Sequence, residues 1–144
     1  MRNVAARIGL SALLAAGCLT GAAGTAHADT ASAERLYAPS ALVLTLAKGE
    51  DPVHSTVQRA TLLRCSPTPG GDHPAAASAC AGIAAVRGDF TALSGHDPER
   101  VCTKIYDPVI ITAQGVWNGR RVEYREMFPN ECEMLREKGE VFAF

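Results

Sequence analysis

Apolar residues alternate with polar or smaller residues in several stretches, which is the pattern of β-strands that bury one face. The stretches "ALVLTLAKG" (41–49) and "TVQRATLLRC" (56–65) each predict a strand. In "VIITAQGVWNGRRVEYREMF" (109–128), two β-rich runs flank an Asn-Gly dipeptide at 118–119, which is the strongest short signal for a hairpin. A final strand is predicted for "EVFAF" (140–144).

Two other stretches have the composition and boundary signals of helices. The alanine-rich "AAASACAGIAAV" (75–86) follows Asp72 or His73 as the capping residue and is followed by Gly88, which suits the end of a helix. "NECEMLREKG" (130–139) predicts a shorter second helix.

The order of these elements sets the fold class. Between the second strand and the first helix, "SPTPGGDHP" (66–74) contains three prolines and two glycines and predicts a loop. Strands outnumber helices, and the two do not alternate. We therefore predict an α+β fold: a five-stranded antiparallel sheet with two helices on one face.

The first 28 residues have the features of a secretory signal peptide. Arg2 and Arg7 supply a positive start, an apolar run rich in small residues follows, and residues 26–28 form an Ala-His-Ala cleavage motif. Residues 1–28 are therefore predicted to be removed, which leaves residues 29–144 as one secreted, extracellular domain.

Two further features of the chain bear on whether it binds a membrane or a nucleic acid. A weak lipoprotein motif ends at Cys18, but Ala15 stands where a leucine is expected, so we favour secretion without a membrane anchor. Without the signal, 12 Lys and Arg face 15 Asp and Glu, which gives a net charge of about −3. A slightly acidic chain is not typical of a nucleic-acid binder.

Four cysteines remain after the signal: Cys65, Cys80, Cys102 and Cys132. An even number in a small secreted domain indicates two disulfides, for which three pairings exist. Sequential pairing would close loops of 15 and 30 residues and stabilise the fold by roughly 3–4 kcal/mol for each bond. The chain has no CxxC motif and no nearby pair of histidines, so we predict no metal site and no cofactor.

Candidate catalytic residues are poorly placed for an enzyme. Many carboxylates lie in charged runs that suit a solvated face, and His54, His73 and His96 lie in predicted loops. Neither a GxSxG elbow nor an HExxH motif is present. A triad assembled from distant parts of the chain remains open, because triads are recognised by geometry rather than by sequence order. We predict that the protein is not an enzyme.

The stretch "VCTKIYDP" (101–108) offers a different chemistry. A trypsin-like protease selects lysine or arginine before the bond that it cleaves, through an aspartate in its pocket. A loop that presents Lys104 would be a substrate, and it would be an inhibitor if it were rigid enough for the cut ends to stay in place and rejoin. The alternative is an ordinary edge strand over 101–106, with Lys104 as an exposed charge that protects the edge.

The chain resembles the Streptomyces subtilisin inhibitor family. The resemblance lies in "LYAPSALVLTLAKG" (36–49), "HPAAASACAGIAAVRGD" (73–89), the stretch from "VCTKIYDPV" to "NECEM" (101–134), and the final "VFAF". It implies a secreted, usually dimeric inhibitor of subtilisin-like and sometimes trypsin-like serine proteases. It also implies a five-stranded antiparallel sheet with two helices, and the sequential disulfides Cys65–Cys80 and Cys102–Cys132.

The resemblance also assigns roles to individual residues. The reactive bond would be Lys104–Ile105, and Asn130 would support the loop from beneath. Many members have proline where this chain has Thr103, which leaves the loop slightly less constrained. A secreted binding module with a target other than a protease is the alternative function. The other residues expected to contact the protease are Val101, Cys102, Thr103 and Tyr106.

Overall fold

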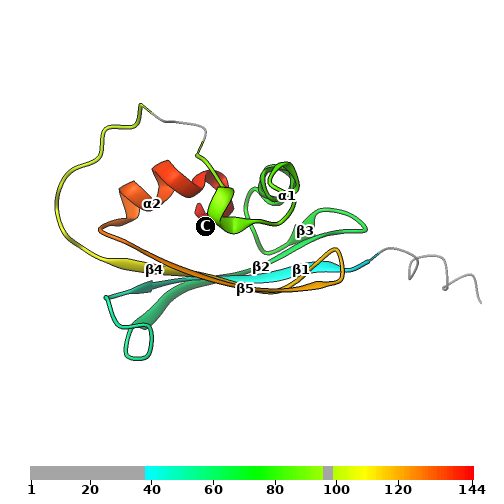
Figure 1. The fold of residues 1–144 in the computed structure, drawn as a ribbon, viewed down its shortest axis with the longest axis horizontal. Helices are drawn as coiled ribbons and strands as arrows, with labels where there is room; N and C mark the ends of the chain where they lie inside the picture. Colours follow the sequence, from blue (N-terminus) through cyan, green and yellow to red (C-terminus); the bar gives the residue numbers. More distant parts are fainter. Residues whose placement is uncertain (1–37, 96–98) are drawn as a thin grey trace, which may run out of the picture.

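A single antiparallel sheet is the framework of the part that the structure describes, residues 38–95 and 99–144 of the computed structural model. The predicted signal peptide, the start of the mature chain and His96 lie outside the described residues. The sheet order is β3-β2-β1-β4-β5, and both helices lie on the same face (Figure 1). The elements are β1 (Ser40–Lys48), β2 (Thr56–Ser66), β3 (Gly70–Gly71), α1 (Ala76–Ala85), η2 (Phe90–Ala92), β4 (Val109–Trp117), β5 (Arg120–Phe128), α2 (Glu131–Lys138) and η3 (Gly139–Phe142).

The predicted hairpin is confirmed, and it joins β4 to β5. Asn118 and Gly119 have φ angles of 49° and 75°, the left-handed conformation that a tight two-residue hairpin turn requires and that these two residue types tolerate best. The Ser40 hydroxyl accepts a hydrogen bond from the Asn118 backbone N–H at 2.9 Å, which ties the turn to the start of the central strand β1.

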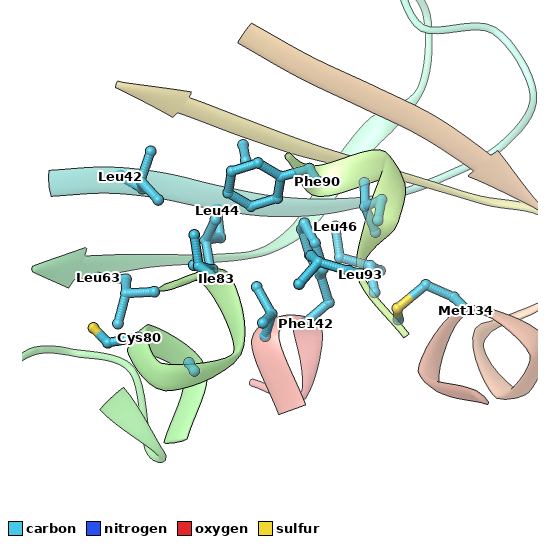
Figure 2. Close-up of a cluster of buried hydrophobic side chains, with 14 of the residues drawn as sticks. Leu42, Leu44, Leu46, Leu63, Cys80, Ile83, Phe90, Leu93, Met134 and Phe142 are labelled. Atoms are coloured by element: carbon cyan, nitrogen blue, oxygen red, sulfur yellow. The ribbon is translucent and has the colours of Figure 1, made fainter. Parts of the chain in front are cut away.

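Alternation along β1 separates the two faces of the sheet. Leu42, Leu44 and Leu46 are at most 1% exposed and point toward the helices, whereas Val43 is 46% exposed on the opposite face. Figure 2 shows these leucines facing side chains from α1, η2, η3 and α2. Four aromatic residues lie in this core or pack against it: Trp117, Tyr124, Phe142 and Phe144.

The sheet has five strands as predicted, but the prediction for the C-terminus is wrong. Gly139–Phe142 forms the 3-10 helix η3, in which the neighbouring residues Val141 and Phe142 are both buried. Two consecutive side chains of a strand point to opposite faces, so a strand could not bury this pair on one side. The fifth strand is instead Gly70–Gly71, inside the segment that was predicted to be a loop.

The start of α1 differs in detail from the capping prediction. The residue before the helix is Ala75, which has no side-chain cap. His73 accepts a hydrogen bond at Nδ1 from the Ala75 N–H at 3.1 Å, and its Nε2 lies 3.2 Å from the Val141 carbonyl oxygen. With Nδ1 as the acceptor, Nε2 must be the donor, so a neutral imidazole joins α1 to η3. Asp72 does not have this role.

Both disulfides have the sequential pairing. Cys65 at the end of β2 is bonded to Cys80 of α1, with Cα atoms 5.5 Å apart. Cys102 is bonded to Cys132 of α2, with Cα atoms 5.6 Å apart. Each bond therefore attaches a helix to a different part of the chain, in the geometry that disulfides prefer.

A buried lysine anchors the far end of α2. The Lys138 side chain is only 4% exposed, and its Nζ lies 2.9 Å from a carboxylate oxygen of Glu126 on β5. The Tyr124 hydroxyl also donates to Glu126. Burial raises the pKa of Glu126, but the hydrogen bonds from Tyr124 and Lys138 and the charge of Lys138 together lower it below its usual value.

We expect Glu126→Gln to destabilise the fold by about 1–3 kcal/mol at pH 7, because it leaves the buried Lys138 ammonium without its anion. A carboxyl group whose pKa is lower in the folded state than in the unfolded state stabilises the fold at pH values above its unfolded pKa, about 4.3. This stabilisation is lost as the pH falls through the folded pKa. Urea unfolding should therefore show that the free energies of unfolding of the variant and of wild type differ less at pH 3 than at pH 7.

Glu123→Gln is the matched control, because Glu123 is an exposed acid on the same strand. It should change the free energy of unfolding by less than about 0.5 kcal/mol. An equal loss for Glu126→Gln at both pH values would contradict the assigned role of the carboxylate.

Candidate functional site

The segment 101–108 is an extended loop without helix or strand, so it is not the edge strand that was the alternative. It forms the wide arc beside α2 before the chain enters β4 (Figure 1). Val101 is 93% exposed, and Ile105 and Tyr106 are 68% and 60% exposed. Several large apolar side chains exposed within one short segment are typical of a surface where a partner binds.

Two attachments hold this loop to the start of α2. The disulfide Cys102–Cys132 fixes its N-terminal side. The side-chain amide of Asn130 donates to the Thr103 carbonyl at 3.2 Å and to the Ile105 carbonyl at 3.0 Å. These two carbonyls flank Lys104, so one amide group fixes the backbone on both sides of the lysine.

Asn130 is held in place because it also caps α2. Its backbone is extended, and its Oδ1 accepts a hydrogen bond from the Glu133 N–H at 2.9 Å, the usual arrangement of an asparagine before the first helical turn. The residue is 7% exposed. The cap orients the side chain, so its Nδ2 points at the loop.

The C-terminal side of the loop is attached to the end of β1. Lys48 forms an ion pair with Asp107, and the Tyr106 hydroxyl donates to Glu50. The hydrogen bond to the Glu50 carboxylate, followed by burial, raises the pKa of the Tyr106 phenol. The Asp107 N–H donates to the Pro129 carbonyl at 2.9 Å, which is a third attachment on this side.

Lys48 and Glu50 were not among the residues predicted to hold the loop. Both lie at the point where β1 ends, and Lys48 pairs with Val109, the first residue of β4, in the strand register. A prediction that aligned β1 with β4 would have placed them beside the loop, whereas their residue types alone give no signal.

Lys104 points into solvent over a nearly buried acid. Its side chain is 89% exposed, and its Nζ lies 3.5 Å from a carboxylate oxygen of Glu133, whose side chain is 7% exposed. The guanidinium of Arg136, one turn later in α2, also pairs with this carboxylate. The contact between Lys104 and Glu133 was not foreseen, because Glu133 lies in a charged run that suits a solvated face.

The described residues contain no group of three or more His, Cys, Asp or Glu side chains arranged to hold a metal ion. In the same part of the chain, His54 pairs with Asp51 in the turn after β1, and His73 belongs to the junction of α1 and η3. No helix among the described residues is long and apolar enough to cross a membrane.

Comparison with known proteins identifies the family of the chain. The model of the family "Subtilisin inhibitor-like" matches residues 38–130, which include the sheet, the loop and Asn130. The chain belongs to the subtilisin inhibitor-like family. That family is made up of protease inhibitors, so the expectation that the chain is not an enzyme is confirmed.

Individual members of the subtilisin inhibitor-like family are similar over most of their length. The chain is 45% identical to a subtilisin inhibitor of Streptomyces violaceus, over 99% of this chain and 98% of that protein. It is 55% identical to subtilisin inhibitor-like protein 5 of Streptomyces fradiae, over 75% of this chain and all of that protein.

A solved structure supports the fold directly. It is the crystal structure of Streptomyces caespitosus sermetstatin in complex with Bacillus licheniformis subtilisin. The sermetstatin chain is 42% identical, and the superposition covers 74% of this chain and 99% of that chain with a TM-score of 0.66.

We expect Asn130→Asp to loosen the loop without unfolding the domain. Aspartate keeps an oxygen that caps α2 but has no N–H to donate to the Thr103 and Ile105 carbonyls, so the cap survives and the brace is lost. Backbone relaxation measured by NMR should show larger amplitudes at residues 103–106, while the chemical shifts of α2 in the same spectra remain helical.

Asn130→Ala is the companion variant, because it removes both roles. It should give the same loop motion together with a further stability loss of about 1 kcal/mol from the missing cap. A loop as rigid in Asn130→Asp as in wild type would show that the amide does not brace it.

Proposed function

We propose that the protein inhibits serine proteases of the subtilisin and trypsin types by presenting the loop 101–108 as a substrate that is not released. The observation that carries the proposal is the amide of Asn130, which donates to the carbonyls on both sides of Lys104. A protease would cleave an unattached loop with an exposed lysine and release it. In a loop with both flanks fixed, the two ends produced by the cut stay together. The subtilisin complex of sermetstatin supports the subtilisin half of the proposal.

The bond attacked is Lys104–Ile105 in this proposal. The serine of the protease adds to the Lys104 carbonyl, and the amine of Ile105 becomes the leaving group. Cys102–Cys132 retains the acyl side, and Tyr106 and Asp107 retain the amine side through their contacts with the end of β1. The amine therefore stays beside the acyl group and reforms the peptide bond faster than water removes it.

Rigidity also favours tight binding. A flexible loop would lose conformational entropy when it entered the protease cleft, but this loop is ordered before binding. Val101, Cys102, Thr103 and Tyr106 lie beside Lys104 in the loop, so we assign them to the contact surface.

The same proposal places the protein outside the cell. Residues 1–28 serve as the signal peptide, and the two disulfides require an oxidising compartment. The inhibitor domain is then residues 29–144, which acts where secreted proteases are found.

We expect Lys104→Met to separate the two protease types. In a trypsin pocket the lysine ammonium meets a buried carboxylate, so its loss should weaken inhibition by about 2–5 kcal/mol. Subtilisin has a broad pocket that accepts an apolar side chain, so the same change should leave its inhibition within a few-fold of wild type. Inhibition constants for both enzymes provide the measurement.

Arg120→Met is the control, since it also removes an exposed cation but lies at the β4–β5 hairpin, far from the loop in Figure 1. It should change neither constant.

Prolonged incubation of wild type with catalytic trypsin should give one new N-terminus, Ile105-Tyr106-Asp107. A cut elsewhere with inhibition intact would contradict the assigned bond, and inhibition of neither enzyme would favour a binding module with another target.

We also propose that the mature protein is a homodimer. The sheet face opposite the helices carries Val43, Leu62 and Met127, which are 46%, 39% and 50% exposed. In the strand register, Val43 pairs with Leu62, so the two lie side by side on that face. A second copy would cover this apolar surface.

Sedimentation equilibrium at micromolar concentration should give about twice the monomer mass of roughly 12–13 kDa, which is expected for 116 residues at about 110 Da each. Val43→Glu should give a monomer, because it places a charge in the apolar face. Val53→Glu, which changes an 80% exposed valine in the turn after β1, should leave the mass unchanged. A wild-type mass of about 12–13 kDa, the mass of one chain, would refute the dimer.

A further inference from the structure

Glu133 occupies a special position relative to Lys104. Its carboxylate is the acceptor that this chain itself offers to the Lys104 ammonium, at 3.5 Å. It lies in the first turn of α2, directly after the cysteine that anchors the loop. The protease pocket in the proposed function is a second acceptor for the same ammonium.

We propose that Glu133 is a specificity-determining residue, which holds the Lys104 ammonium in the free inhibitor and competes with the protease for it. This inference rests on the proposed function. A lysine or arginine at position 104 must leave Glu133 in order to bind, whereas a neutral side chain has no such contact to lose. Glu133 therefore favours inhibition through neutral residues at 104 over inhibition through cationic ones.

Glu133 cannot follow the lysine into a protease. Its side chain is 7% exposed, its backbone N–H is bonded to Asn130, and its carboxylate is paired with Arg136. A specificity pocket surrounds the side chain that enters it, so the ammonium cannot touch the pocket and Glu133 at once. Binding replaces one carboxylate partner with another.

The remaining contact with Arg136 limits the cost of this exchange. After Lys104 leaves, the Glu133 carboxylate still has a cation beside it, so no unpaired charge is buried. Of the two ion pairs that Glu133 forms, only the one with the exposed Lys104 is lost. Exposed ion pairs are weak and sensitive to salt, so we expect Glu133 to reduce inhibition of trypsin by about two- to fivefold.

The test is Glu133→Gln, which removes the charge and keeps a residue that suits the third position of a helix. Its inhibition constant for trypsin should fall two- to fivefold at about 0.05 M salt, and the gain should disappear by about 1 M salt. In a Lys104→Met background, assayed with subtilisin, the same change should have no effect.

Glu131→Gln is the matched control, because Glu131 lies in the same helical turn but pairs with Arg59 instead of Lys104. It should leave trypsin inhibition unchanged. Equal gains from both variants would attribute the effect to the general field of the helix and overturn the proposal, as would an unchanged or weaker inhibition by folded Glu133→Gln.

A spectroscopic measurement does not depend on how Glu133→Gln folds. The side-chain carboxyl carbon of Glu133 should shift in the NMR spectrum of Lys104→Met relative to wild type, and that of Glu131 should not. An unchanged Glu133 resonance overturns the contact. Failure of wild type to inhibit either protease would instead refute the proposed function, which distinguishes the two.

Discussion

The side-chain amide of Asn130 is the interaction on which the loop depends. Its oxygen accepts from the first turn of α2, and its nitrogen donates to two carbonyls of a segment more than 20 residues earlier in the chain. A helix cap is normally a local matter, but here it also fixes the backbone on both sides of Lys104. The shape of the loop therefore follows from where α2 begins, and α2 is in turn held by the disulfide at Cys132 and by Lys138 at its other end.

The helix α2 also sets the charge around Lys104. Glu133 and Arg136 lie one turn apart and place a negative and a positive group beneath the loop. The same short element thus caps, braces and supplies a counter-ion. A change that moves α2 would alter loop geometry and loop electrostatics together, and stability measurements alone would not separate the two effects.

Much of the fold could be predicted from local pattern, and the contacts of the loop could not. Alternation in β1 and the Asn118-Gly119 turn specify their structure within a few residues. The C-terminal "VFAF" has the composition of a strand, and only packing of Val141 and Phe142 against the helices makes it η3. The stretch 101–108 itself suggested Lys104 as a residue for a trypsin-like pocket, whereas the support by Asn130 was expected from the resemblance alone. The pairs Lys48–Asp107 and Glu50–Tyr106 join residues 59 and 56 positions apart, so they depend on strand register rather than on any local signal.

Because residue 103 is threonine rather than proline, the loop depends more strongly on these distant contacts. Proline would restrict its own φ and stiffen the backbone next to Lys104, but threonine does not fix φ. The rigidity of this loop must then come from tertiary attachments: the disulfide before Lys104, Asn130 on both sides of it, and the end of β1 after it. The hydrogen bonds and the ion pair among these attachments persist only while α2 stays packed on the sheet that contains β1, whereas the disulfide remains bonded. If the proposed function holds, conditions that loosen this packing well before global unfolding would turn the inhibitory loop into an ordinary substrate.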